Sequence, residues 1–177
     1  ELPEGVDVAV LAIPRAAVLP SVQALAGRRV GAIIVFSAGY AEGGEAGRDE
    51  QGELARICRE HGIVLEGPNC LGLVNHVDGV PLTFIEMTLE KLGPRPGIGI
   101  VSQSGAMAAV LGVNLLARGL GVSFSVSTGN EADRGVEDFV EYLADDPHTR
   151  VLALIVEQDR KSTRLNSSHT DISRMPS

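Results

Sequence analysis

The sequence contains no tryptophan, and aromatic residues make up only 3% of its 177 residues. Hydrophobic residues nevertheless account for 44% of the chain, so any core must be built from aliphatic side chains. A chain this rich in apolar residues can bury a core, which argues against wholesale disorder. The length is enough for one ordinary domain or two small ones.

Cysteine is also scarce, because the chain has only Cys58 and Cys70, and neither belongs to a CxxC motif. We therefore expect neither disulfides nor a metal site. No signal peptide is visible and no apolar run reaches the length of a membrane span, so we expect a cytoplasmic protein without membrane contact. The formal net charge of −8 disfavours nucleic acid as a partner, because its phosphates attract basic surfaces.

The first 75 residues combine short aliphatic runs with helical patterns. The runs are nearly all apolar and rich in β-branched residues, as in strands that are buried on both faces. The predicted order is strand, helix, strand, helix, strand, over Val6–Ile13, Arg15–Ala26, Val30–Phe36, Asp49–His61 and Ile63–Leu65. This order is one half of a doubly wound parallel sheet. The glycine-rich stretch Glu42–Gly47 is predicted to be a loop.

A second α/β unit is predicted from Gly97 onward. The stretch before it, Gly72–Pro96, is rich in proline and is interpreted as an irregular crossing segment. Strands and helices then alternate over Ile98–Val101, Ala106–Arg118, Val122–Ser127, Val136–Ala144 and Val151–Val156. We therefore predict an α/β fold with parallel sheets, divided into a domain at residues 1–75, a linker at 76–96 and a second domain at 97–158.

The aliphatic pattern stops at Asp159, where serine, threonine, arginine and asparagine take over. The stretch DRKSTRLNSSHTDISRMPS resembles, in its opening and closing portions, the translation of a short-read sequencing adapter. The alternative is an ordinary polar terminus. We expect residues 159–177 to be a non-native, disordered tail that has no part in function.

The turn Ser102–Ala106 joins a buried strand directly to a helix. Ser102 and Ser104 are of a residue type that caps helices, and Gly105 has no side chain to block a ligand. The first N–H groups of a helix have no intrahelical partner and carry a partial positive charge. The turn can therefore hold a phosphate or a carboxylate, although a capped turn without a ligand would have the same sequence.

Three further loops follow predicted strands, at the carboxyl ends where open α/β sheets bind ligands. Gly67–Cys70 contains Asn69, which can form hydrogen bonds, and Cys70, for which a packed, unreactive role is favoured over that of a nucleophile. Thr128–Asp133 mixes glycine with amide and acidic groups, as a solvated connection also would. Glu157 is either an edge residue of its strand or a carboxylate that orients a histidine.

Four segments occur in a specific order, namely GPNCLGLVN, GIGIVSQSGAMAAVL, STGNEADRGVEDFVEYLADDP and LALIVE. Together they resemble the NDP-forming acyl-CoA synthetases and, more distantly, succinyl-CoA synthetase α subunits, over residues 5–158. The resemblance implies the C-terminal part of a Rossmann-like CoA-binding domain, followed by the start of a flavodoxin-like ligase domain. It also implies a ligase that interconverts acyl-CoA, phosphate and ADP with a free acid, CoA and ATP, through an acyl phosphate and a phosphohistidine.

The same resemblance implies roles for individual residues. It implies a phosphate site at Ser102, Gln103, Ser104, Gly105 and Ala106. It implies a CoA site at Pro14, Arg15, Ser37, Ala38, Gly39, Asn69 and Cys70. Glu157 matches the glutamate that orients the phosphorylated histidine. The implied substrates are CoA and a small carboxylic acid, and we expect an oligomer.

Several parts of the family pattern do not occur in these 177 residues. The Gly-rich loop for the CoA phosphates would lie upstream of residue 1, and the active histidine would lie downstream of Glu157. None of the four histidines has the required context, at His61, His76, His148 or His169. The ATP-grasp unit, which handles ATP or ADP with Mg²⁺, would be a fused domain or a β subunit. We therefore expect a fragment that is itself inactive as a ligase.

Two other interpretations remain open at this point. A CoA-sensing regulatory module, of the kind fused to protein acetyltransferases, would keep the same two halves without the synthetase chemistry. An NAD-dependent oxidoreductase would need a Gly-rich fingerprint and an acidic residue after the second strand, and the sequence has neither. The ligase and the regulatory module are distinguished by whether the parent protein has the family's active histidine downstream of Glu157.

Overall fold

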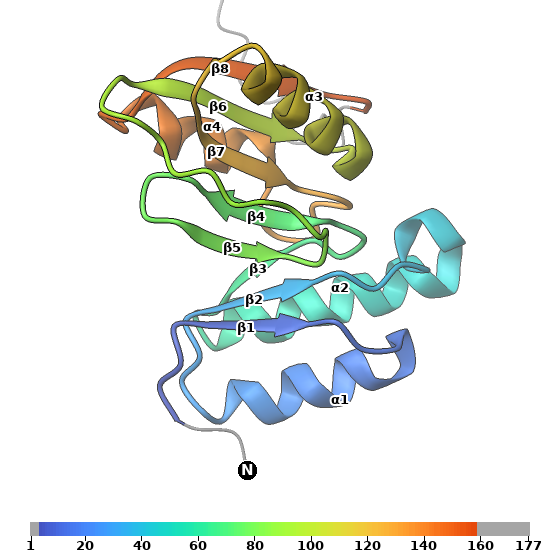
Figure 1. Ribbon diagram of the computed structural model, residues 1–177. Helices are drawn as coiled ribbons and strands as arrows, with labels where there is room; N and C mark the ends of the chain where they lie inside the picture. The colour runs from blue at the N-terminus through green and yellow to red at the C-terminus, as the bar shows by residue number, and fades with distance from the viewer. Residues whose placement is uncertain (1–3, 159–177) are drawn as a thin grey trace, which may run out of the picture.

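The computed structural model describes residues 4–158, which form two β-sheets with helices packed against them (Figure 1). One sheet has the strand order β1-β2-β3, and the other has the order β5-β4-β7-β6-β8. The α/β fold class that the sequence predicted is confirmed. The tail predicted at residues 159–177 lies outside the described part of the chain.

The first sheet consists of three parallel strands, β1 (Val8–Leu11), β2 (Ala32–Val35) and β3 (Val64–Glu66). Helix α1 (Arg15–Ala26) connects β1 to β2, and a short 3-10 helix, η1 (Ala41–Gly43), and helix α2 (Glu45–Glu60) connect β2 to β3. Both helices cover one face of the sheet, because their apolar residues share one cluster with alternate strand residues. The cluster includes Val18, Val22, Leu25, Leu54, Ile57, Ile33, Val35 and Leu65. It is the aliphatic core that the composition predicted.

Helix α2 begins earlier than the sequence pattern predicted. The prediction of a loop at Glu42–Gly47 is wrong, because η1 and the first turn of α2 occupy most of that stretch. Gly47 is required there by packing, since a Cβ atom at this position would lie 2.0 Å from the carbonyl oxygen of Tyr40. The glycine therefore indicates a close contact of the helix and not a flexible connection.

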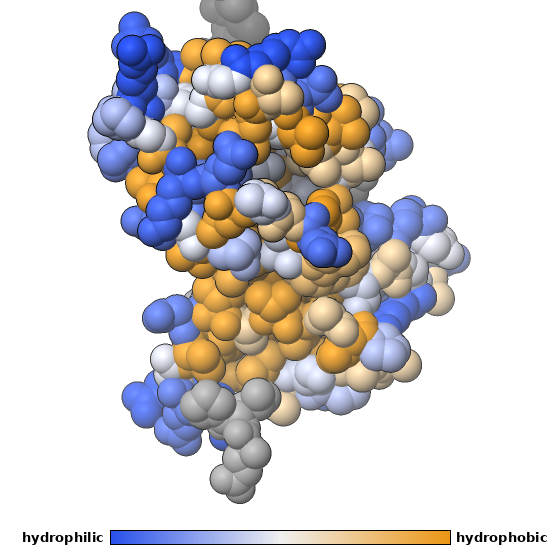
Figure 2. All heavy atoms as spheres, in the orientation of Figure 1, coloured by the Kyte–Doolittle hydropathy of each residue, from blue (hydrophilic) through white to orange (hydrophobic). Residues whose placement is uncertain are grey.

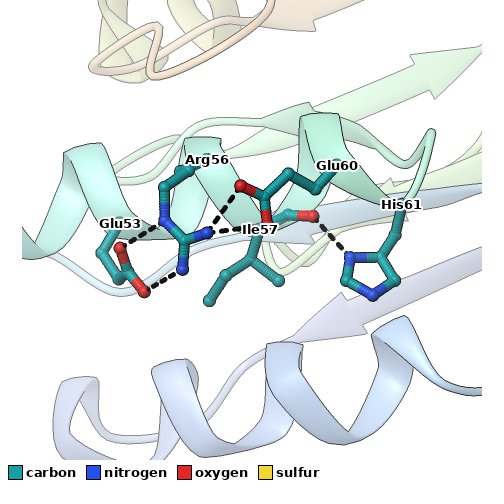
Figure 3. Close-up of polar contacts among 5 residues, drawn as sticks. All are labelled: Glu53, Arg56, Ile57, Glu60 and His61. Carbon is teal, nitrogen blue, oxygen red and sulfur yellow. Dashed lines mark hydrogen bonds and ion pairs between the residues drawn. The ribbon is translucent and has the colours of Figure 1, made fainter.

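The outer side of α2 is charged and faces solvent (Figure 3). The guanidinium of Arg56 forms ion pairs with Glu53 and Glu60, both at 2.6 Å. At the end of the helix, the His61 ring places Nδ1 3.0 Å from the carbonyl oxygen of Ile57. These exposed ion pairs add little to stability, and His61 lies on the solvent side of the helix end.

The second sheet begins with a hairpin that the sequence pattern did not predict. Strand β4 (Gly72–Asn75) pairs antiparallel with β5 (Val80–Thr83) on one side and with β7 (Val122–Ser127) on the other. The prediction that Gly72–Pro96 is irregular is therefore wrong over β4 and β5, and β5 lies inside the predicted linker at 76–96. Pro81 is compatible with β5 because β5 is the edge strand, where a backbone N–H needs no strand partner.

The remaining strands of the second sheet, β6 (Gly97–Ser102), β7 and β8 (Thr149–Ile155), are parallel as predicted. Helices α3 (Gly105–Ala117) and α4 (Val136–Ala144) pack on opposite faces of this sheet. The evidence is that Ile100 belongs to the apolar cluster beneath α3, whereas its neighbour Val101 belongs to the cluster beneath α4. Side chains alternate along a strand, so adjacent residues face opposite sides.

The two sheets are joined by the loop 128–134, which follows β7 and lies along the segment after β3. Two backbone N–H groups of the loop donate to carbonyl oxygens of that segment, Asn130 to Pro68 at 2.8 Å and Ala132 to Gly67 at 2.9 Å, and the N–H of Arg134 donates to Leu65 of β3 at 3.2 Å. Gly129 has a φ of 59°, and a Cβ atom there would lie 2.5 Å from the carbonyl oxygens of Pro68 and Asn69. A close approach of two backbones therefore sets the position of one sheet relative to the other.

Candidate functional site

A cavity of about 440 Å³ lies between the two sheets, where the carboxyl ends of β2, β3, β6, β7 and β8 meet. The predicted site residues in its lining are Ala38, Asn69, Cys70, Gln103, Ser104, Gly105, Ala106 and Glu157. These residues are far apart in the sequence, and the two sheets bring them together. In open α/β sheets the crevice at the carboxyl ends of the strands is where ligands bind.

The turn Ser102–Ala106 presents a helix N-terminus to this cavity. Ser104 occupies the N-cap position of α3 with an extended backbone, but its side chain makes no cap hydrogen bond. The Ser102 hydroxyl instead accepts from the Ser104 N–H at 3.1 Å and donates to the Ser104 carbonyl at 2.7 Å. The expectation that these hydroxyls cap the helix is therefore wrong. With no cap from the N-cap side chain, the first-turn N–H groups of α3 remain suited to an anion.

Gln103 uses its side chain to hold the end of β8. Its Oε1 accepts hydrogen bonds from the backbone N–H groups of Glu157 and Gln158, both at 2.9 Å. Its Nε2 donates to the Gln158 carbonyl at 2.8 Å and to the Glu131 carboxylate at 3.1 Å. These four hydrogen bonds use the full capacity of a glutamine amide. Gln103 is therefore a positioning residue, and its side chain is not free to bind phosphate.

Glu131 is a buried carboxylate whose role sequence reasoning missed. It is 8% exposed, and its Oε1 accepts from the Thr128 hydroxyl at 2.8 Å and from the Val136 N–H at 3.1 Å. With Gln103 on its other oxygen, the carboxylate has the donors that a buried charge needs. The loop pattern gave no signal for this role, because Gln103 lies 28 residues earlier in the chain.

Cys70 lines the cavity, but its environment does not suit a nucleophile. The residue is 3% exposed, and its thiol donates to the Val35 carbonyl at 3.4 Å. Burial, with a contribution from the Glu66 carboxyl, raises the pKa of the Cys70 thiol to about 12. Glu66 is itself buried, and burial raises its pKa to about 8. The thiol is thus protonated at neutral pH, which supports the packed role favoured from the sequence.

Four residues predicted to bind CoA lie beside the cavity and not in its lining, namely Pro14, Arg15, Ser37 and Gly39. The Nε of Arg15 donates to the Glu50 carboxylate at 2.8 Å, and its guanidinium lies 5.2 Å from the centre of the Tyr40 ring. The Ser37 hydroxyl donates to the Ile13 carbonyl at 2.5 Å. These contacts hold the loops after β1 and β2 in place next to the cavity.

Glu157 lines the cavity with an exposed side chain. Among residues 4–158 no histidine lines this cavity, and His76 lines a separate groove. The same residues contain no group of three or more His, Cys, Asp or Glu that could hold a metal ion. Within this described part, no helix is long and apolar enough to cross a membrane.

Comparison with known proteins accounts for both halves of the chain. Residues 1–76 match the family described as CoA binding domain, and residues 95–175 match the family described as succinyl-CoA ligase like flavodoxin domain. The two matches together cover most of the chain, which therefore comprises a CoA-binding domain and a succinyl-CoA ligase-like flavodoxin domain. The order of the two domain types is the one that the resemblance implied.

Individual relatives agree with this assignment. The chain is 56% identical to trans-feruloyl-CoA synthase FCS1 from an unknown prokaryotic organism, over 91% of this chain and 23% of that protein. It is 34% identical to acetate–CoA ligase (ADP-forming) II subunit alpha of Pyrococcus furiosus, over 89% of this chain and 33% of that subunit. The chain also resembles a solved structure, the dinucleotide forming acetyl-coenzyme A synthetase 1 of Ca. Korarchaeum cryptofilum in complex with phosphate and ADP. The two superpose with a TM-score of 0.80 at 28% identity, over 89% of this chain and 33% of that one. The chain thus spans about a quarter to a third of the length of these relatives.

Proposed function

We propose that this chain supplies the CoA-binding and phosphate-binding part of an ADP-forming acyl-CoA synthetase. The complete enzyme interconverts acyl-CoA, phosphate and ADP with a small carboxylic acid, CoA and ATP in the cytoplasm. The observation that carries the proposal is the N-terminus of α3, which opens without a side-chain cap into the cavity between the two family domains. Backbone N–H groups and the helix dipole favour an anion at such a place.

The proposed reaction, in the direction of ATP formation, has three steps. A phosphate oxygen attacks the thioester carbonyl carbon, the C–S bond breaks, and CoA leaves as a thiolate with formation of an acyl phosphate. A histidine nitrogen then takes the phosphoryl group, and the acid leaves as a carboxylate. Finally the phosphoryl group passes from the histidine to ADP. In this proposal the histidine and the ATP-grasp unit with its Mg²⁺ come from outside residues 4–158, either in a fused domain or in a β subunit.

Residues of this chain bind the anions and orient the groups in these steps. The N–H groups of Gly105 and Ala106 donate to phosphate oxygens, and each such charge-assisted hydrogen bond contributes about 1.5–3 kcal/mol. Glu157 accepts the N–H of the histidine and fixes its orientation. The backbone bonds to Gln103 hold Glu157 in place for this task.

CoA lies along the loops that follow the strands of the first sheet. Its contacts come from Pro14, Arg15, Ser37, Ala38, Gly39, Asn69 and Cys70. Asn69 has a φ of 56°, and its amide donates to the side-chain oxygen of Asn130 at 3.3 Å. Asn69 therefore connects the CoA-binding loops to the loop that joins the two sheets. Cys70 contributes the packed wall of the site and no covalent chemistry.

Phosphate binding to the full chain tests the anion site directly. Ala106→Glu places a carboxylate in the first turn of α3, where an acidic residue favours the helix but repels a bound anion. Ala106 is exposed, and α3 has no acidic residue in its first turn, so the fold should be retained. Ala106→Gln is the matched control, because it has the same size without the charge. Phosphate is titrated in, and the amide signals of residues 104–107 are followed by NMR.

We expect Ala106→Glu to weaken phosphate binding by about tenfold or more, and Ala106→Gln to bind as the wild type does. Equal binding by the glutamate variant and the wild type would overturn the assignment of the turn. The wider activity is tested by replacing the matching segment of the feruloyl-CoA synthase relative with residues 4–158. A folded chimera that forms no acyl-CoA would contradict the proposed function.

A further inference from the structure

A second cavity, of about 130 Å³, lies between α3 and the hairpin β4–β5. In Figure 1, α3 lies on the front of the second sheet, and the chain from β5 to β6 passes below it in this view. The α3 wall begins with four small residues, Gly105, Ala108, Ala109 and Gly112, which share one helix face because they are three or four residues apart. It continues with Val113 and Leu116. The facing wall comes from β4 and the segment after β5, and most of the lining is apolar. We call this cavity the α3 groove.

The α3 groove has room for a ligand because the first two turns of the helix contribute only glycine and alanine to its lining, ahead of Val113 and Leu116. A Cβ atom at Gly112 would meet only the Cδ1 atom of Ile100, at 3.8 Å. Protein interiors leave few spaces of this size unfilled. An apolar cavity of about 150 Å³ is known to accept benzene, so the α3 groove is on the scale of one six-membered ring.

The α3 groove adjoins the site described above. Leu71 and Gly105 line both cavities. A Cβ atom at Gly105 would lie 2.2 Å from the Cγ atom of Leu71, so the Leu71 side chain packs on the bare backbone at the start of α3. The Leu71 N–H donates to the Ser127 hydroxyl at 3.0 Å, which fixes this residue. A carboxylate held by the first turn of α3 therefore lies next to the entrance of the groove.

The α3 groove also contains a few polar groups. His76 is 2% exposed, and its Nδ1 lies 2.7 Å from the Glu90 carbonyl oxygen. A carbonyl oxygen only accepts, so Nδ1 of His76 donates the hydrogen bond. The serines at 125 and 127 also belong to the lining. A mostly apolar wall with a small number of polar groups is typical of small-molecule sites.

We propose that the α3 groove binds the substituent of the carboxylic acid substrate, and that this substituent is an apolar group of the size of an aromatic ring. The proposal rests on the proposed function, because it places the carboxyl group at the anion-binding turn of α3. Acetate, whose methyl group leaves the groove empty, is then a poor ligand. The small residues on α3 determine the specificity, since any larger side chain would occupy the space of the ring.

The test uses the full chain, with benzoate and acetate as probes and phosphate as the reference ligand. We expect the wild type to bind benzoate more tightly than acetate by about tenfold or more, because the ring buries apolar surface. Gly112→Leu fills the groove and should remove this preference while leaving phosphate binding unchanged. Leucine also favours a helix more than glycine does, so α3 should persist. Ala109→Leu is a second filling variant from the same helix face.

The matched control is Ala117→Leu, which adds the same side chain to α3 at an exposed position outside both cavities. It should keep the preference for benzoate. A wild type that binds benzoate no more tightly than acetate overturns the groove proposal, as does a folded Gly112→Leu variant with unchanged benzoate binding. In both cases persistent phosphate binding leaves the proposed function intact. If the wild type binds no phosphate, the proposed function fails as well.

Discussion

Replacing Glu66 by glutamine should stabilise the protein at neutral pH. The residue is 4% exposed, and its Oε1 has no hydrogen-bond partner among the described residues. Burial raises the pKa of this carboxyl from its ordinary value of 4.5 to about 8. The folded protein therefore retains the Glu66 proton at pH 7, whereas the unfolded chain has released it.

The size of the effect follows from this difference in proton binding. Between pH 4.5 and about pH 8 the folded state binds more protons at Glu66 than the unfolded state, so the free energy of unfolding falls as the pH rises through this window. Because a difference of one in pKa corresponds to about 1.4 kcal/mol, the loss at pH 7 is about 3 kcal/mol. Glutamine has nearly the same shape and no proton to retain. Glu66→Gln should therefore raise the melting temperature at pH 7 by roughly 6–12 °C and change it little at pH 4.5.

Urea unfolding followed by circular dichroism, at about pH 5 and about pH 8, measures this difference. The control is Glu141→Gln, which removes the same charge from an exposed position on α4. We expect the control to follow the wild type at both pH values, and Glu66→Gln to gain stability relative to both as the pH rises. The same pH dependence in Glu66→Gln and the wild type would refute the reasoning, since it would show that the Glu66 carboxyl titrates alike in the folded and unfolded states.

Three further predictions concern packing and hydrogen bonding. Gly129→Ala should lower the free energy of unfolding by about 3 kcal/mol, because the added Cβ would overlap the carbonyl oxygens of Pro68 and Asn69. The control Gly119→Ala, which has a similar φ but open space around the Cβ, should lower it by only about 1 kcal/mol. Equal losses of stability in urea would contradict this. Cys58 and Cys70, whose pKa values burial raises to about 11 and about 12, should resist iodoacetamide until the protein unfolds, and mass spectrometry showing rapid labelling of the folded protein would disprove it. Gln103→Leu should cost about 1–3 kcal/mol, because it removes partners from a buried carboxylate and from the end of β8, and an unchanged urea midpoint would argue against that role.

The regular part of the fold was predictable because each buried strand is a short aliphatic run and each helix has its own apolar spacing. The bounds of α1, β7 and α4 are those that the sequence pattern predicted. The hairpin β4–β5 was not predictable in the same way. Its strands are short and contain Pro81, and the hairpin joins the larger sheet only through the pairing of β4 with β7, which comes much later in the chain. Local pattern contains no information on such pairing.

The position of the candidate site was predictable only in part from the strands. Each loop in it follows a strand, where open α/β sheets bind ligands, but Asn69 follows a strand of the first sheet, whereas the turn at 102–106 and Glu157 follow strands of the second. That Asn69 lies beside this turn was implied by the family resemblance and not by the strand pattern. The sequence could not show which polar side chains form hydrogen bonds and ion pairs within the protein and are therefore not free to bind a ligand. Arg15 pairs with Glu50, which lies 35 residues away, and that partner depends on how α1 and α2 pack together.

Gln103 shows how the two kinds of role combine at this site. The family resemblance implied that it is a ligand of the phosphate together with Ser102 and Ser104, yet its side chain holds the backbone at Glu157 by a hydrogen bond of 2.9 Å. The residue directly precedes the N-cap of α3, so one short segment connects the anion-binding turn to the carboxylate at the end of β8. A phosphoryl group can be passed on efficiently only between groups that are held at fixed positions. The amide at position 103 therefore contributes to the proposed reaction by fixing the distance between the helix N-terminus and Glu157, without touching the phosphate.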